Sequence, residues 1–140
     1  MNAQTLTKDF ASACKKLEGA LKQKNPSELE QAGSIQYFEL AFELAWKTCK
    51  AKAEELGLTE VRSPKAALKE AKTQGWLGEE RVWLEMLEAR NRMAHVYSAK
   101  QALEVFGRMK IFSSALGKLA KNFLSSNPRA SPGGQTTSPR

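Results

Sequence analysis

The sequence predicts an all-α protein, an antiparallel bundle of about five helices. Apolar residues recur every three or four positions in four long stretches, which is the period of a helix with one buried face. Serines stand where helices would start and glycines where they would end, and nothing reads as a strand. Short connections between long helices favour antiparallel neighbours. With 140 residues, of which 41% are hydrophobic, the chain can form one packed domain.

The first two helices have clear apolar stripes. The spacing predicts a first helix over residues 5–24, before "KNPS", with apolar positions at Leu6, Phe10, Ala13, Leu17 and Leu21. Ser27 and Glu30 form a capping-box pattern that starts the second helix, and Gly57 offers a stop about 30 residues later. The stripe of this second helix comprises Ile35, Phe38, Phe42, Ala45 and Cys49.

The third and fourth helices are shorter. Ser63 followed by Pro64 marks the start of the third, which Gly75 ends. The fourth is expected over residues 79–93. It carries two adjacent stripes, so its apolar face is broad and should be well buried. The first stripe comprises Val82, Met86, Ala89 and Met93, and the second comprises Trp83, Leu87 and Arg90.

Ser98 and Gln101 repeat the capping-box pattern and predict a fifth helix that runs to about Leu124. We therefore expect a bundle over residues 1–124. Residues 125–140 combine Pro, Gly, Ser and Thr without an apolar anchor, which is typical of a disordered tail, and we assign it no function.

Composition also bears on location and partners. Two distant cysteines, Cys14 and Cys49, make neither a disulfide framework nor a metal site. We see no secretory signal and no membrane span, so we expect a soluble cytoplasmic protein. The net charge of +7 favours a polyanionic partner such as nucleic acid, but lysines spread over the helices are equally compatible with a solvated basic surface.

The stretch "LEARNRMAHVY" holds the only histidine, His95, five residues after Arg90. On an unbroken helix these side chains would point about 140° apart. The cap at Ser98 requires non-helical backbone before it, so the fourth helix should stop near Met93. His95 would then lie at a helix end, where Arg90 can reach toward it.

Such a pair suits phosphodiester chemistry. Histidine can accept or return a proton near neutral pH, and an arginine fork binds phosphate and stabilises transition-state charge. Because RNA supplies its own 2′-hydroxyl nucleophile, the chemistry needs no metal, and we expect neither a metal nor a cofactor. The alternative is structural: His95 bonds to backbone in a loop, and Arg90 forms a salt bridge.

The segment "RNRMAHVY" resembles the signature of HEPN domains at four positions, Arg90, Asn91, His95 and Tyr97. The second helix, "YFELAFELAWKTCK", and the start at Ser63 also resemble one branch of that superfamily, the nucleotidyltransferase substrate-binding proteins. The likeness covers roughly residues 5–124.

The resemblance implies a homodimer that brings two such motifs together, and a minimal nucleotidyltransferase as antitoxin partner. It implies a toxin that is a metal-independent endoribonuclease, with Arg90 and His95 catalytic and Asn91 as an accessory polar group. The partner would silence it by AMPylation of Tyr97. Two alternatives remain: a non-catalytic substrate-binding or regulatory subunit that holds RNA or a nucleotide, and a purely structural helical dimer.

Glu39 and Glu43 lie one turn apart on the second helix, where like charges repel by a few tenths of a kcal/mol. A nearby cation should compensate, and we count both as accessory site residues. Lys47 is one candidate; Arg90 or the dimer mate is the other.

Overall fold

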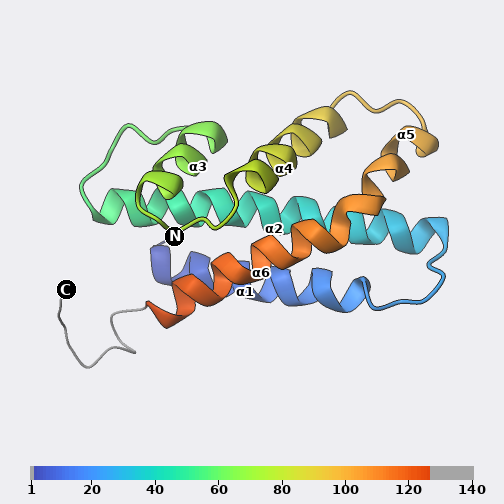
Figure 1. Ribbon diagram of the computed structural model, residues 1–140, viewed down its shortest axis with the longest axis horizontal. Helices are drawn as coiled ribbons and strands as arrows, with labels where there is room; N and C mark the ends of the chain where they lie inside the picture. Colours follow the sequence, from blue (N-terminus) through green and yellow to red (C-terminus); the bar gives the residue numbers. More distant parts are fainter. Residues whose placement is uncertain (1, 127–140) are drawn as a thin grey trace.

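The computed structural model describes residues 2–126 and shows six α-helices and one 3-10 helix (Figure 1). The all-α fold and the helical bundle predicted from the sequence are confirmed. The elements in chain order are α1 (Ala3–Ala20), α2 (Glu28–Glu55), α3 (Pro64–Thr73), α4 (Glu80–Met93), α5 (Ala99–Leu103), the 3-10 helix η1 (Glu104–Arg108) and α6 (Met109–Ser125).

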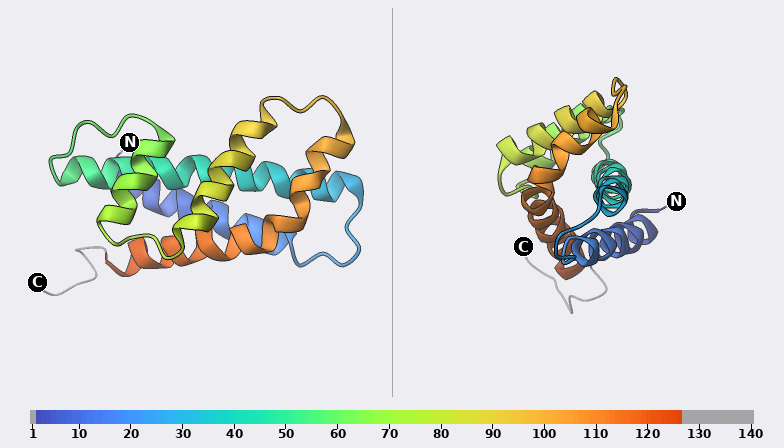
Figure 2. Two further views of the ribbon diagram at one scale, coloured as in Figure 1. Left: turned by 45° about the horizontal axis from the view of Figure 1, so that its top comes forward. Right: turned by 90° about the vertical axis from the view of Figure 1, so that its right-hand side faces the viewer.

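The longest helix, α2, forms the middle of the bundle. In Figure 1, α1 and α6 lie along one side of α2, whereas α3 and α4 lie along the other. In the left view of Figure 2, α3 and α4 cross α2, and the start of α4 lies next to α6, which α4 contacts. Helix α2 contacts α1, α3, α5, η1 and α6, and α6 also contacts α1 and α4. Two long antiparallel helices, α1 and α2, therefore provide the platform on which the remaining elements pack.

Aromatic side chains connect α2 to α4 and α6. The rings of Phe38 and Phe112 stack with their centroids 5.2 Å apart, and those of Phe42 and Trp83 lie 6.4 Å apart. All four side chains are buried, and such ring pairs contribute about 0.5–1.5 kcal/mol beyond the burial of their area. This aromatic seam fixes where α4 sits on α2, and thus where the end of α4 projects.

Most predicted helix boundaries are confirmed. Ser27 and Glu30 make both hydrogen bonds of the capping box, and the Ser63 hydroxyl accepts from the Ala66 amide at 3.1 Å. Gly57 follows α2 with φ +86°, and Gly75 follows α3 with φ +79°. Glycine adopts this left-handed conformation without a steric penalty, so both residues end their helices as predicted.

Two boundaries were wrong. The first helix ends at Ala20 and not at residue 24; the chain turns ahead of Pro26, where Asn25 has φ +50°, outside the right-handed helical region. The fifth helix is not continuous: it is divided into α5, η1 and α6. The division includes Gly107, whose helix propensity is about 1 kcal/mol poorer than that of alanine. The expected tail lies, from residue 127, outside the described residues.

Cys14 and Cys49 are buried in the core as free thiols. Burial raises the pKa of each thiol to about 12, so both stay protonated and act as small apolar groups. Within residues 2–126, none of the helices combines the length and the apolar character needed to cross a bilayer.

Candidate functional site

Residues 90–98 comprise the last turn of α4 and its connection to α5, and we name them the motif corner because they contain the Arg90-to-Tyr97 motif (Figure 1). Helix α4 ends at Met93, where the sequence places its end. The amide of His95 donates to the carbonyl of Arg92 at 2.9 Å, which closes the last turn. His95 therefore lies just beyond a helix end, as expected.

Two hydrogen bonds hold the second half of the motif corner. The Ser98 hydroxyl accepts from the Gln101 amide at 3.2 Å, and the Gln101 side-chain oxygen accepts from the amide of Tyr97 at 3.1 Å. In a standard capping box that second bond would return to Ser98 itself. The bond to Tyr97 is displaced by one residue, so Gln101 orients the backbone of the motif tyrosine directly.

Arg90 reaches across to α2. Its Nη2 donates to Oε1 of Glu43 at 3.4 Å, and its Nη1 donates to the Asn91 side-chain oxygen at 3.2 Å. The other oxygen of Glu43 lies 3.5 Å from the Nζ of Lys47. Both expected cations therefore share Glu43, and this ion pair ties the middle of α2 to the end of α4.

Glu39 differs from Glu43, although the two lie one turn apart. Burial raises the pKa of Glu39, and among the described residues it forms no ion pair. Of the two carboxylates, therefore, Glu43 alone has its negative charge compensated by nearby cations. Glu39 remains a half-buried acid on the α2 surface, whose charge the fold disfavours.

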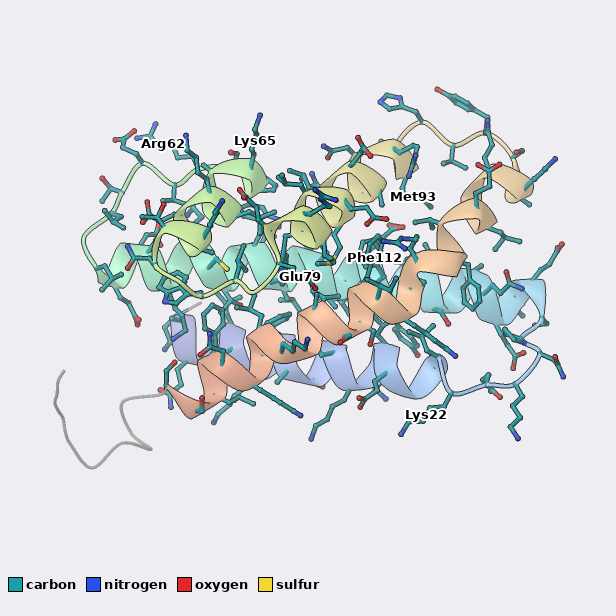
Figure 3. The ribbon with its side chains drawn as sticks, viewed as in Figure 1. Lys22, Arg62, Lys65, Glu79, Met93 and Phe112 are labelled. Atoms are coloured by element: carbon teal, nitrogen blue, oxygen red, sulfur yellow. The ribbon has the colours of Figure 1, made fainter. Side chains whose placement is uncertain are left out.

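His95 is exposed and lines a small pocket of about 240 Å³ between the motif corner and η1. Arg92 and Arg108 line the same pocket, whereas Arg90 does not. Its apolar floor is formed by Met93 and Phe112, both labelled in Figure 3. The single chain thus brings the imidazole together with two guanidinium groups, but not with the arginine that the motif pairs with it.

Arg108 was missed by the sequence reasoning. It donates to both oxygens of Glu85 on α4, from Nε at 2.6 Å and from Nη2 at 2.7 Å. These hydrogen bonds, with the charges of Arg108 and Arg92, lower the pKa of Glu85. The two residues are 23 positions apart in sequence, so no local pattern indicates the pair. It closes one side of the His95 pocket and braces η1 against α4.

Tyr97 is 86% exposed, which makes it the most exposed large hydrophobic side chain among those described. No hydrogen bond involves its phenol in the described part of the chain, and Asn91 is also exposed. The motif corner can therefore offer a free phenol, an accessible imidazole and guanidinium groups to a partner or to a phosphate. Over residues 2–126, no three His, Cys, Asp or Glu side chains are grouped so that they could hold a metal ion.

Comparison with known proteins places this geometry in a family. A crystal structure of a protein from Thermus thermophilus is similar to the chain with a TM-score of 0.72 and 28% identity, over 80% of this chain and 96% of that one. No curated protein matches the chain. The family model described as nucleotidyltransferase substrate binding protein like matches residues 6–125, which include every helix from α2 to α6 and the whole motif corner. With most of its length matched, the chain belongs to this family of nucleotidyltransferase substrate-binding-like proteins.

Proposed function

We propose that the protein is the binding subunit of a nucleotidyltransferase, and that its motif corner presents Tyr97 as the acceptor of a nucleotidyl group. The single observation that carries this proposal is the exposure of Tyr97. Its side chain is 86% exposed on the motif corner, whose second half is held by the hydrogen bonds of Ser98 and Gln101. The family description, which associates such proteins with a nucleotidyltransferase, supports the same partner.

The reaction would take place in the active site of the partner. The phenol oxygen of Tyr97 would attack the α-phosphorus of a bound nucleoside triphosphate, so that a new O–P bond forms and the bond to the leaving pyrophosphate breaks. The phenol proton passes to a base, and the imidazole of His95 is exposed at the same corner. The product would carry a negatively charged phosphate beside the arginines of the motif corner.

The test is co-expression with a minimal nucleotidyltransferase encoded next to this chain's gene, if the neighbouring reading frame holds one, followed by intact-mass analysis. The chain has two tyrosines, so Tyr37→Phe is a matched control for Tyr97→Phe. Tyr37 lies on α2 and is 38% exposed. We expect AMP on the wild type and on Tyr37→Phe but not on Tyr97→Phe. Modification of the Tyr97 variant, or an unmodified wild type that still copurifies with its partner, would refute the acceptor role.

A second candidate function is the toxin activity implied by the HEPN resemblance, a metal-independent endoribonuclease with Arg90 and His95 catalytic. The observation in its favour is the pocket in which His95 lies with Arg92 and Arg108, since imidazole and guanidinium groups together suit phosphodiester cleavage. Within one chain Arg90 is paired with Glu43, so this function requires the arginine of a second copy or a release of that pair.

RNA cleavage and growth arrest test the second candidate. His95→Ala and Arg90→Ala should abolish both in the presence of EDTA, and Tyr97→Phe should still cleave RNA while it escapes silencing. The products should carry a 2′,3′-cyclic phosphate or its hydrolysis product. Full cleavage by His95→Ala, or strict dependence on added metal, would exclude this mechanism.

The homodimer also remains a proposal. The resemblance implies it, but the broad apolar face of the fourth helix does not require it, because Trp83, Met86 and Ala89 are buried within the single chain. The remaining support for a dimer is the exposure of two leucine side chains that a second copy could cover. Leu84 on α4 is 47% exposed, and Leu40 on α2 is 50% exposed. Light scattering at micromolar concentration should give twice the mass of the chain, and a monomer would count against it.

A further inference from the structure

A second concave surface lies away from the motif corner, between the end of α1, the loop that follows it and one face of α6. This groove has a volume of about 1020 Å³ and shares no lining residue with the His95 pocket. We name it the lysine groove after the five lysines that line it, Lys22, Lys24, Lys110, Lys118 and Lys121. Figure 3 labels Lys22 at the edge of the molecule opposite α3.

The lysine groove holds most of the net charge of the described residues. Arg129 and Arg140 lie outside these residues and account for two units of the net charge of +7, which leaves +5. The five lysines and the single acid of the groove, Glu18, carry four of those five units. The lysines are thus not evenly spread, as the sequence suggested, because folding gathers the excess positive charge at one surface.

None of these five lysines forms an ion pair among residues 2–126. Other basic residues do, such as Lys47 with Glu43, Lys50 with Glu54 and Lys72 with Glu80. All five groove lysines are exposed, so their ammonium groups keep their charge available to an external anion. Concentrated and uncompensated charge of one sign attracts polyanions over long range.

The arrangement on α6 suits a linear chain of phosphates. Lys110, Ser114, Lys118 and Lys121 follow one face at steps of three or four residues. From Lys110 to Lys121 the helix advances roughly 16 Å, a length that can face several successive phosphates of one strand. The hydroxyls of Ser113 and Ser114 make no hydrogen bond among the described residues and can donate to phosphate oxygens.

The composition of the groove favours nucleic acid over an acidic protein. Protein interfaces are depleted of lysine and enriched in arginine and large aromatic residues. The lysine groove has no arginine among its described lining residues, and Phe106 is the one aromatic residue there. Lysines and hydroxyls are the groups that contact a sugar-phosphate backbone, and none of them reads a particular base.

We propose that the lysine groove binds the phosphodiester backbone of a nucleic acid without reading its sequence. The site is independent of the proposed function, since it lies outside the motif corner and contains none of its residues. It gives the protein a way to hold a nucleic acid strand whether or not the motif corner acts on it.

The experiment measures binding of labelled 12-nucleotide homopolymeric RNA and DNA to the full chain by fluorescence anisotropy. The salt concentration is varied between about 0.05 and 0.5 M, because phosphate contacts make the affinity depend on salt. Lys118→Gln with Lys121→Gln removes two groove lysines from one helix. Lys65→Gln with Lys69→Gln is the matched control, because it removes two exposed lysines from α3 and leaves the same net charge. Circular dichroism verifies that both double variants fold.

For the wild type we expect log K to fall with log salt with a slope of about −3.5 for five phosphate contacts on a single strand. The groove variant should reduce this slope by about 1.4, so that on lowering the salt from 0.5 to 0.05 M its affinity should rise roughly 25-fold less than that of the wild type. The α3 control should remain near the wild type for both RNA and DNA.

Equal weakening by the two double variants, or no binding by the wild type at the lowest salt concentration, would overturn the proposal. So would a poly-glutamate peptide that binds more tightly than either oligonucleotide through the same lysines, because the groove would then be a site for an acidic protein. AMPylation of Tyr97 in the groove variant should equal that of the wild type. The two proposals can therefore fail separately.

Discussion

Replacing Ser98 by alanine should loosen the motif corner without unfolding the bundle. The Ser98 hydroxyl caps α5 through the Gln101 amide, and loss of such a cap costs about 1 kcal/mol. Helix α5 has five residues, none of them buried, so little of the core depends on it. The cost should therefore appear as local opening, about fivefold more frequent than in the wild type.

Hydrogen exchange measures this opening at the amides of Gln101 and Ala102, which donate to Ser98 in the native structure. Both should exchange about fivefold faster in Ser98→Ala, while the melting temperature stays within about 1 °C of the wild type. Tyr97, whose amide bonds to Gln101, should become more mobile as a consequence.

Ser63→Ala is the matched control, because Ser63 caps α3 with a bond of similar length, 3.1 Å to the Ala66 amide. Helix α3 buries Ala67, Leu68 and Ala71, so its cap supports the core. This variant should lose about 1 kcal/mol of global stability and about 3 °C in melting temperature. If Ser98→Ala lowers the melting temperature as much and leaves local exchange unchanged, α5 unfolds only with the core and the reasoning fails.

Three further predictions concern stability. Gly33→Ala should stabilise the protein by about 0.5–1 kcal/mol, whereas Gly57→Ala should destabilise it by about 1–2 kcal/mol. An added Cβ meets nothing within 4 Å at either site, but only Gly57 has φ +86°. Equal urea midpoints of the two variants would contradict this. Arg108 lowers the pKa of Glu85, so the Glu85 carboxylate stabilises the fold above its ordinary pKa of 4.5, and this stabilisation is lost as the pH falls through the pKa of the folded state. Glu85→Gln should therefore be less stable than the wild type at neutral pH, and the difference in unfolding free energy should shrink on acidification. Glu39 has its pKa raised by burial, so Glu39→Gln should be more stable at neutral pH, and this gain should vanish below pH 4.5 in the same urea titrations.

The local features of this fold were predictable because each depends on a few neighbouring residues. A serine hydroxyl reaches an amide three residues ahead, so the caps at Ser27, Ser63 and Ser98 can be read from spacing. Glycine after a helix identifies the stops at Gly57 and Gly75 in the same way. The end of α4 near Met93 followed from the cap at Ser98, since the two helices need non-helical backbone between them.

The candidate site was predictable only in part. The sequence named the residues of the motif corner and both cations that could reach Glu43, but it could not choose between them. It also placed Arg90 within reach of His95, which stays a prediction, and it could not show that the packed helices bring Arg90 to Glu43. That choice depends on the rotation of α4, which the contact of Phe42 with Trp83 fixes across two helices.

Sequence alone thus determined most of the helices and most of their ends, the all-α class and the place of the motif at a helix corner, because hydrogen bonds and apolar periodicity act within one turn or one stripe. Only the tertiary structure decided which side chains meet. It paired Glu85 with Arg108, divided the expected fifth helix at η1, and gathered lysines from the end of α1 and from α6 into one groove. These outcomes depend on how helices far apart in the chain pack. The sequence around a charged residue does not indicate which distant residue it will contact in the folded protein.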